Sequence, residues 1–98
     1  MSVALEPYVF DTLMPDLVGH DRQPSAFPVY LMLARHTHGV ERQRVTMAQQ
    51  DIAESCGLSK RTVQAAPAHL RRRTLIAVMQ AHRTSVPEYA VLRPWRRG

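Results

Sequence analysis

Apolar side chains recur at helical spacing in two parts of the chain. The first set falls at positions i, i+3, i+4 and i+7 and consists of Phe27, Tyr30, Leu31 and Ala34. Ser25 precedes this set as a candidate N-cap, so the pattern predicts a core helix that runs to about Thr37 and stops near Gly39. The second set has the same spacing and consists of Val63, Ala66, Pro67 and Leu70. It predicts an amphipathic helix that Ser59 caps, with this stripe facing inward.

A further helix is expected between these two. Thr46 and Gln49 match a capping box, in which a hydroxyl and an amide side chain satisfy backbone N–H groups. The residues behind them that would be buried are Ala48, Ile52, Ala53 and Cys56. Gly57 then stands where a left-handed C-cap is needed.

The period changes outside the helical stretches. Residues 76–80 and 89–92 are typical of strands, Val86-Pro87 between them forces a turn, and residues 43–45 read as a short extended stretch. At the other end a helix can open at Pro7, but Pro15 interrupts it, so two short helical pieces are expected before a loop over 19–24. The predicted order is helices, a short strand, two helices and a β-hairpin.

Composition limits the class of protein. The chain has 98 residues, 45% of them hydrophobic, which suffices for one compact domain with a real core. It contains one cysteine, Cys56, so it forms no internal disulfide and fits a reducing, cytoplasmic compartment. No apolar run approaches the ~20 residues that cross a bilayer, and the first six residues lack the features of a secretory signal.

Charge divides the chain into two parts. Residues 1–34 hold four acidic residues and one arginine, a net of −3, whereas residues 35–98 hold twelve basic and four acidic residues, a net of +8. The sum is the formal net charge of +5. Such a division is typical of a domain with one surface that faces a polyanion.

The stretch from Gln50 to Gln64 meets the separate requirements of a helix-turn-helix. These are a small residue facing the partner helix, a tight turn, an apolar plug, an N-cap and an inward β-branched residue, supplied by Ala53, Gly57, Leu58, Ser59 and Val63.

This stretch resembles the helix-turn-helix of winged-helix bacterial regulators, a group that includes MarR-like and plasmid replication-initiator-like domains. The resemblance covers roughly residues 25–93 and is carried by Ala53, Gly57-Leu58-Ser59, Arg61-Thr62-Val63, Leu70 and Leu75-Ile76. It implies a mainly α fold with a small β-hairpin, in which a three-helical core carries a wing. Residues 1–24 would be an extra N-terminal helical extension, and residues 94–98 a basic C-terminal tail. Two residues depart from the pattern: Pro67 tends to kink the second motif helix, and Thr74 replaces the usual glycine, so that helix end needs another solution.

Duplex DNA is the partner that this resemblance implies, with residues of about 59–72 as the recognition helix. With Val63 inward, the outward residues of that helix are Lys60, Arg61, Gln64, Ala65 and Ala68. Arg61 could read guanine and Gln64 adenine in the major groove. Expected contacts to the DNA backbone come from Ser59, Thr62, Arg71, Arg72 and Arg73. Arg83 and Thr84 are expected at the wing tip, where they could touch the backbone or the minor groove. Arg93, Arg96 and Arg97 are expected in a mobile tail that adds non-specific affinity, with Trp95 as its packing anchor.

Other functions receive less support from the residues. No nucleophilic triad, phosphate-binding loop or metal-ligand spacing is present, so we expect no enzyme, metal or cofactor. The alternative is a winged helix that binds a protein partner instead of DNA; single-stranded or RNA binding is weaker, because the basic half offers few aromatic residues for stacking. The N-terminal apolar set could cover the core or form a homodimer contact, and comprises Tyr8, Phe10, Leu13, Met14 and Leu17.

Overall fold

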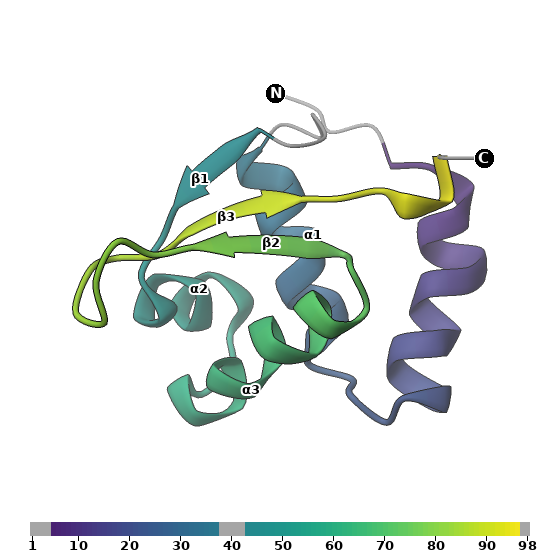
Figure 1. Ribbon diagram of the computed structural model, residues 1–98. Helices are drawn as coiled ribbons and strands as arrows, with labels where there is room; N and C mark the ends of the chain where they lie inside the picture. The colour runs from purple at the N-terminus through teal and green to yellow at the C-terminus, as the bar shows by residue number, and fades with distance from the viewer. Residues whose placement is uncertain (1–4, 38–42, 97–98) are drawn as a thin grey trace.

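The computed structural model describes residues 5–37 and 43–96, and this part of the chain is mainly helical with a small three-stranded antiparallel sheet (Figure 1). Two π-helical stretches come first and a short 3-10 turn comes last. The elements in chain order are η1 (Val9–Leu13), η2 (Pro15–His20), α1 (Ala26–His36), β1 (Arg44–Thr46), α2 (Gln49–Cys56), α3 (Lys60–Arg72), β2 (Ile76–Met79), β3 (Glu88–Val91) and η3 (Pro94–Arg96). The predicted order of elements and the mainly α class are confirmed.

The N-terminal helical segment is continuous rather than divided at Pro15. Met14 joins η1 to η2 with helical dihedral angles, φ −61° and ψ −53°, and its N–H donates to the Val9 carbonyl, five residues back. The prediction of two separate pieces is therefore wrong. Proline removes one donor and crowds the carbonyl four residues earlier, and a wider turn of five residues gives that carbonyl more room.

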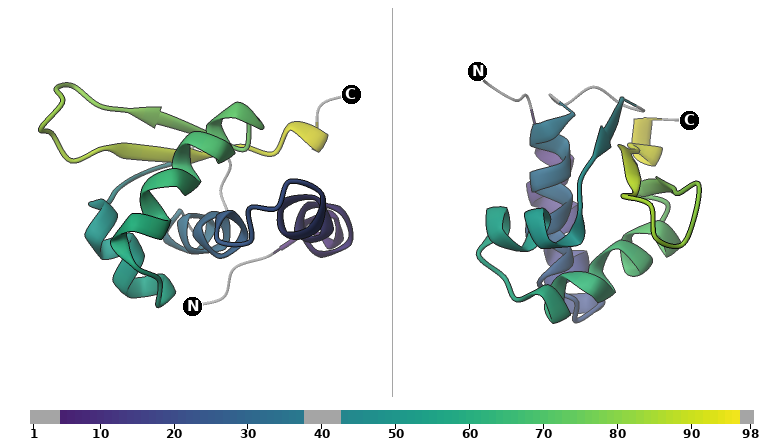
Figure 2. Two further views of the ribbon diagram at one scale, coloured as in Figure 1. Left: turned by 90° about the horizontal axis from the view of Figure 1, so that it is seen from below. Right: turned by 90° about the vertical axis from the view of Figure 1, so that its left-hand side faces the viewer.

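Helix α1 lies at the centre of the fold, with the N-terminal segment on one side, α2 on the opposite side and the sheet across a third (Figures 1 and 2). It ends as predicted at Thr37, whose hydroxyl donates to the carbonyls of Leu33 and Ala34; Gly39 lies outside the described residues. Its start differs from the prediction, because Ser25 has helical dihedral angles and its side chain caps nothing. The Gln23 carbonyl instead accepts the Ala26 N–H at 3.0 Å.

The sheet has the order β1-β3-β2, with both pairs antiparallel. The β2–β3 hairpin forms within a residue or so of its predicted bounds, and the extended stretch predicted at 43–45 is β1. The prediction of a capping box at Thr46 is wrong, because Thr46 pairs with Glu88 in the sheet. Helix α2 accordingly starts later, with Ala48 as an N-cap residue that makes no side-chain hydrogen bond.

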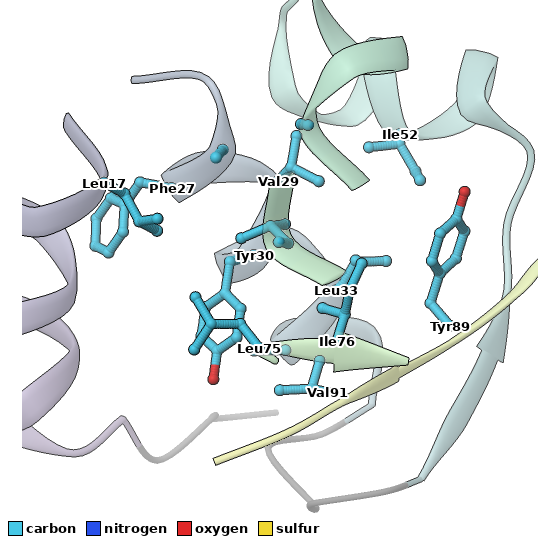
Figure 3. Packing of buried hydrophobic residues seen from close by; sticks show 14 of the residues in the cluster. Leu17, Phe27, Val29, Tyr30, Leu33, Ile52, Leu75, Ile76, Tyr89 and Val91 are labelled. Atoms are coloured by element: carbon cyan, nitrogen blue, oxygen red, sulfur yellow. The ribbon is translucent and has the colours of Figure 1, made fainter. Parts of the chain in front are cut away.

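One hydrophobic core joins all of these elements. Figure 3 shows Leu17 of the N-terminal segment beside Phe27 of α1, and the Tyr89 ring of β3 directed toward Ile52 of α2. The Tyr30 hydroxyl, also buried, donates to the Leu92 carbonyl at 3.1 Å. Because α1, α2 and the sheet share this core, α3 is held against a rigid support with one side outward.

Candidate nucleic-acid interface

Three residues, Gly57-Leu58-Ser59, join α2 to α3. Gly57 has φ +71°, and the N–H groups of Leu58 and Gly57 donate to the carbonyls of Ala53 and Glu54 at 2.9 and 3.3 Å, the pattern of a Schellman motif. The Ser59 hydroxyl accepts the Thr62 N–H at 3.1 Å. The predicted C-cap and N-cap are both confirmed, and together they set the direction in which α3 leaves α2.

Helix α3 runs unbroken from Lys60 to Arg72 through Pro67. Its buried residues are those predicted to face inward: Val63, Ala66, Pro67 and Leu70. The residues predicted to face outward are all exposed: Lys60, Arg61, Gln64, Ala65 and Ala68. Because Pro67 does not end the helix, its last turn is a direct continuation of the turn that carries Arg61.

The end of α3 uses Thr74 in place of the glycine that the resemblance leads one to expect. Thr74 itself adopts the left-handed conformation, with φ +57°. Its N–H donates to the Arg71 carbonyl at 3.0 Å, and the Leu75 N–H donates to the Leu70 carbonyl at 2.9 Å. The expectation of a different helix end is therefore wrong: the same Schellman motif forms, with a β-branched residue in the strained position.

A groove of about 650 Å³ lies between α3 and the β2–β3 hairpin. Three cationic side chains line it: Lys60 and Arg71 from α3, and Arg83 from the β2–β3 loop. Gln64 and Thr84 add polar groups, and none of the described residues that line it is acidic. We call this concave surface the basic groove.

A second set of exposed residues follows the outer side of α3. Arg61, Ala65, Ala68 and Arg72 lie at i, i+4, i+7 and i+11, which places them along one line on the helix surface. Ala68 also lines the basic groove, so the two surfaces adjoin at this residue. We call this line the crest of α3. Its two arginines stand at opposite ends and its two alanines leave the middle low, so that a ligand surface could approach the helix closely.

The predicted contact residues thus fall into two neighbouring groups. Lys60, Gln64, Arg71 and Arg83 line the basic groove, whereas Arg61 and Arg72 lie on the crest. Ser59 and Thr62, predicted to meet phosphate oxygens, are exposed at the start of α3, and their hydroxyl oxygens are 2.7 Å apart. The two hydroxyls share a hydrogen bond, and the Ser59 hydroxyl also accepts the Thr62 N–H, so both already contribute to the N-cap of α3.

Arg73 does not join the other two arginines of its run. Its Nε lies 2.9 Å from Asp21 Oδ2, and its terminal nitrogen lies 3.4 Å from Asp16 Oδ2. Successive helical residues differ by ~100° in direction, so Arg71, Arg72 and Arg73 point to the groove, the crest and the N-terminal segment respectively. Arg73 therefore lies apart from the basic groove and the crest, in ion pairs with two carboxylates.

The expected basic tail is docked rather than mobile as far as the structure describes it. Arg93 is buried, with Nε 3.4 Å from Glu6 Oε1, and so cannot contact a ligand. The expectation that Trp95 anchors the chain end is confirmed, because its indole N–H donates to Glu6 Oε2 at 3.0 Å and its ring stacks on Tyr8 at 4.5 Å. The Arg96 side chain and Arg97 lie outside the described residues.

The N-terminal apolar set divides into buried and exposed side chains. Leu13 and Leu17 are buried in the core, together with Val9. Phe10, Met14 and Val18 are 45, 41 and 42% exposed and follow one another at intervals of four residues on the outer side of the segment. We call these three residues the apolar stripe.

The remaining candidate groups are the single cysteine and the side chains able to bind a metal ion. Cys56 is half-buried against the core, and burial raises the pKa of its thiol, which leaves it a poor nucleophile. Among residues 5–37 and 43–96, no three His, Cys, Asp or Glu side chains gather as a metal-binding group. No helix within the same residues has the length and apolar character needed to cross a membrane.

Comparisons with models of protein families, with curated proteins and with solved structures give no match for this chain.

Proposed function

We propose that this chain binds duplex DNA as a winged helix-turn-helix domain. In the proposal α3 is the recognition helix in the major groove and the β2–β3 hairpin is the wing. The observation that carries it is that the basic groove adjoins the crest of α3. Cationic side chains lie on both surfaces, and none of the described residues that line the groove is acidic. A convex helix beside a concave basic surface is complementary to a major groove flanked by phosphates.

Each group of residues then has its own task. On the crest, Arg61 can make two hydrogen bonds to guanine O6 and N7. At the edge of the basic groove, Gln64 can do the same with adenine N6 and N7. Lys60, Arg71 and Arg83 neutralise phosphates, which supplies affinity without reading sequence. Arg72, at the far end of the crest, is placed for a further phosphate.

The biological role that fits such a module is that of a small transcriptional regulator or a replication-control protein in the cytoplasm, without cofactor or catalysis. The alternative is a protein-interaction module of the same fold. The observation that favours the alternative is the apolar stripe, because exposed apolar groups that share one helix face are typical of protein contacts.

Both uses are compatible if a second copy of the chain covers the apolar stripe. Met14 at its centre would lie near a two-fold axis, with Phe10 of each protomer against Val18 of the other. A dimer of this kind presents two recognition helices to two half-sites of a palindromic duplex. The contact is small, so we expect it to be weak without DNA.

Fluorescence anisotropy with a pool of labelled duplexes at two salt concentrations tests the DNA proposal. The wild type is compared with the double variant Arg61→Ala/Gln64→Ala, and with Arg35→Ala, which removes one exposed charge on α1 outside the basic groove. We expect the wild type and Arg35→Ala to select particular duplexes, and the double variant to keep only weak, salt-sensitive binding. Absence of duplex binding at low salt would contradict the proposal and favour the protein-interaction module.

Light scattering with and without a selected duplex tests the dimer. Met14→Glu, which places a charge at the centre of the apolar stripe, should keep the protein monomeric on one half-site and abolish cooperative binding to two. Cooperative binding that survives this substitution would place the dimer contact elsewhere.

A further inference from the structure

A polar cluster lies behind the last two turns of α3, on the side away from the basic groove. Asp21, in the loop after η2, is at its centre, with a side chain only 9% exposed. Its Oδ2 lies 2.8 Å from His69 Nε2 and 2.9 Å from Arg73 Nε, and its Oδ1 lies 3.1 Å from His20 Nδ1. Three donors therefore surround one carboxylate.

The Asp21 carboxylate is ionised at neutral pH and can only accept hydrogen bonds. The hydrogen bond with His20 is the main influence that lowers its pKa below the ordinary 3.8, and the contacts with His69 and Arg73 act in the same direction against the opposing effect of burial. An ionised carboxylate has no proton to give. The short contact to His69 therefore requires the imidazole Nε2 to carry the hydrogen.

The other imidazole nitrogen of His69 faces the surface. Its Nδ1 lies 3.5 Å from a terminal nitrogen of Arg72, one turn further along α3. A guanidinium has only donors, so Nδ1 must be the acceptor. Both contacts are satisfied together by one form of the ring, the neutral tautomer with its hydrogen on Nε2.

We infer that His69 is a positioning residue for Arg72 and that Asp21 holds it in the Nε2–H tautomer. The His69 side chain is only 14% exposed, whereas Arg72 is exposed on the crest itself. The His69–Arg72 hydrogen bond reduces the number of directions that the long arginine side chain samples. Arg72 is then directed before a phosphate arrives, which lowers the entropy lost on binding. The assignment of Arg72 to a phosphate rests on the proposed function; the tautomer and the contact do not.

A double-mutant cycle, measured as affinity for a selected duplex, tests whether His69 acts through Arg72. We call the chain of contacts Asp21–His69–Arg72 the relay. His69→Phe removes both nitrogens and keeps a ring in the same place. We expect it to weaken binding about three- to tenfold in the presence of Arg72, the range of one hydrogen bond, and to have little further effect in Arg72→Ala. In Arg71→Ala, whose side chain lines the groove and is not in contact with His69, the full loss should persist. An equal loss in all three backgrounds would show that His69 acts through the fold alone and would overturn the inference.

A second measurement keeps the inference testable without DNA. Nitrogen-15 NMR of the imidazole at pH 8, where an ordinary histidine is neutral, should show His69 with its hydrogen on Nε2. In Asp21→Asn, whose amide can accept or donate, the Nδ1–H tautomer should appear. The Arg72 guanidinium should also be more ordered in the wild type than in His69→Phe. A wild-type ring with its hydrogen on Nδ1, or equal order of Arg72 in both proteins, refutes the relay even if duplex binding fails.

Discussion

Replacing Thr74 with glycine should stabilise the protein. Thr74 ends α3 with φ +57°, a conformation that costs a residue with a Cβ atom roughly 1–2 kcal/mol. Glycine adopts it freely but loses more backbone entropy on folding, about 0.5–1 kcal/mol. The hydroxyl of Thr74 donates to the Arg73 carbonyl at 2.6 Å, but the site is exposed and water can replace it. The net gain should be about 0.5–1 kcal/mol in the free energy of unfolding, which for a domain of this size raises Tm by about 2–8 °C.

Urea denaturation followed by circular dichroism measures this gain. Thr74→Ala is the matched control, since it removes the same hydroxyl, keeps the Cβ atom and should not stabilise. Gly57→Ala is the reverse experiment in the same motif: no atom lies within 4 Å of an added Cβ, so any loss comes from φ +71° alone and should be about 0.5–1 kcal/mol. If Thr74→Gly is no more stable than Thr74→Ala, the left-handed residue is not a source of strain and the reasoning fails.

Three other predictions concern charge and packing. Lys60→Ala and Arg83→Ala should each weaken binding to every duplex and reduce the slope of log affinity against log salt by about one, as seen in a salt titration; an unchanged slope would remove that residue from the phosphate contacts. Because the folded pKa of Asp21 lies below 3.8, its ionised form stabilises the protein above pH 3.8, and this contribution is lost as the pH falls through the folded pKa. Urea titrations should therefore show Asp21→Asn less stable than the wild type at pH 7, with a difference that shrinks as the pH falls below 3.8; a constant difference would contradict the shift. Trp95→Ala should lower the free energy of unfolding by on the order of 2 kcal/mol in the same assay, because the indole stacks on Tyr8. Val86→Ala, at a side chain that is 52% exposed, should change the free energy of unfolding little. Equal effects of the two substitutions would mean that the packing of the indole does not stabilise the fold.

Local chemistry accounts for what could be predicted from the sequence. The turn between α2 and α3 depends on one positive φ and one capping hydroxyl, and Gly57 and Ser59 are the residues that supply them. The buried and exposed sides of α3 follow from the spacing of its apolar residues, so the sequence predicts which of its side chains are exposed. The basic groove also requires the β2–β3 loop to lie beside α3, and the periodicity of the sequence carries no information on where that loop lies.

Long-range contacts account for what could not be predicted. Arg73 and Arg93 look like unpaired cations in the sequence, but Asp21 and Glu6, both far earlier in the chain, pair with them. Thr46 has the residue type of an N-cap, but pairing with β3 draws it into a strand. In each case a partner far away in the sequence overrides the local preference. That partner lies outside any short stretch of neighbouring residues from which a prediction is made.

The contact between Glu6 and Trp95 has a consequence for the order of folding. It joins residues 89 positions apart, so the loop that it closes is nearly as long as the described chain, and its entropy must be lost before the contact contributes anything. The helices and the hairpin can form without it. We therefore expect the contact between Glu6 and Trp95 to be absent from the transition state for folding. Trp95→Ala should then accelerate unfolding and leave the folding rate almost unchanged.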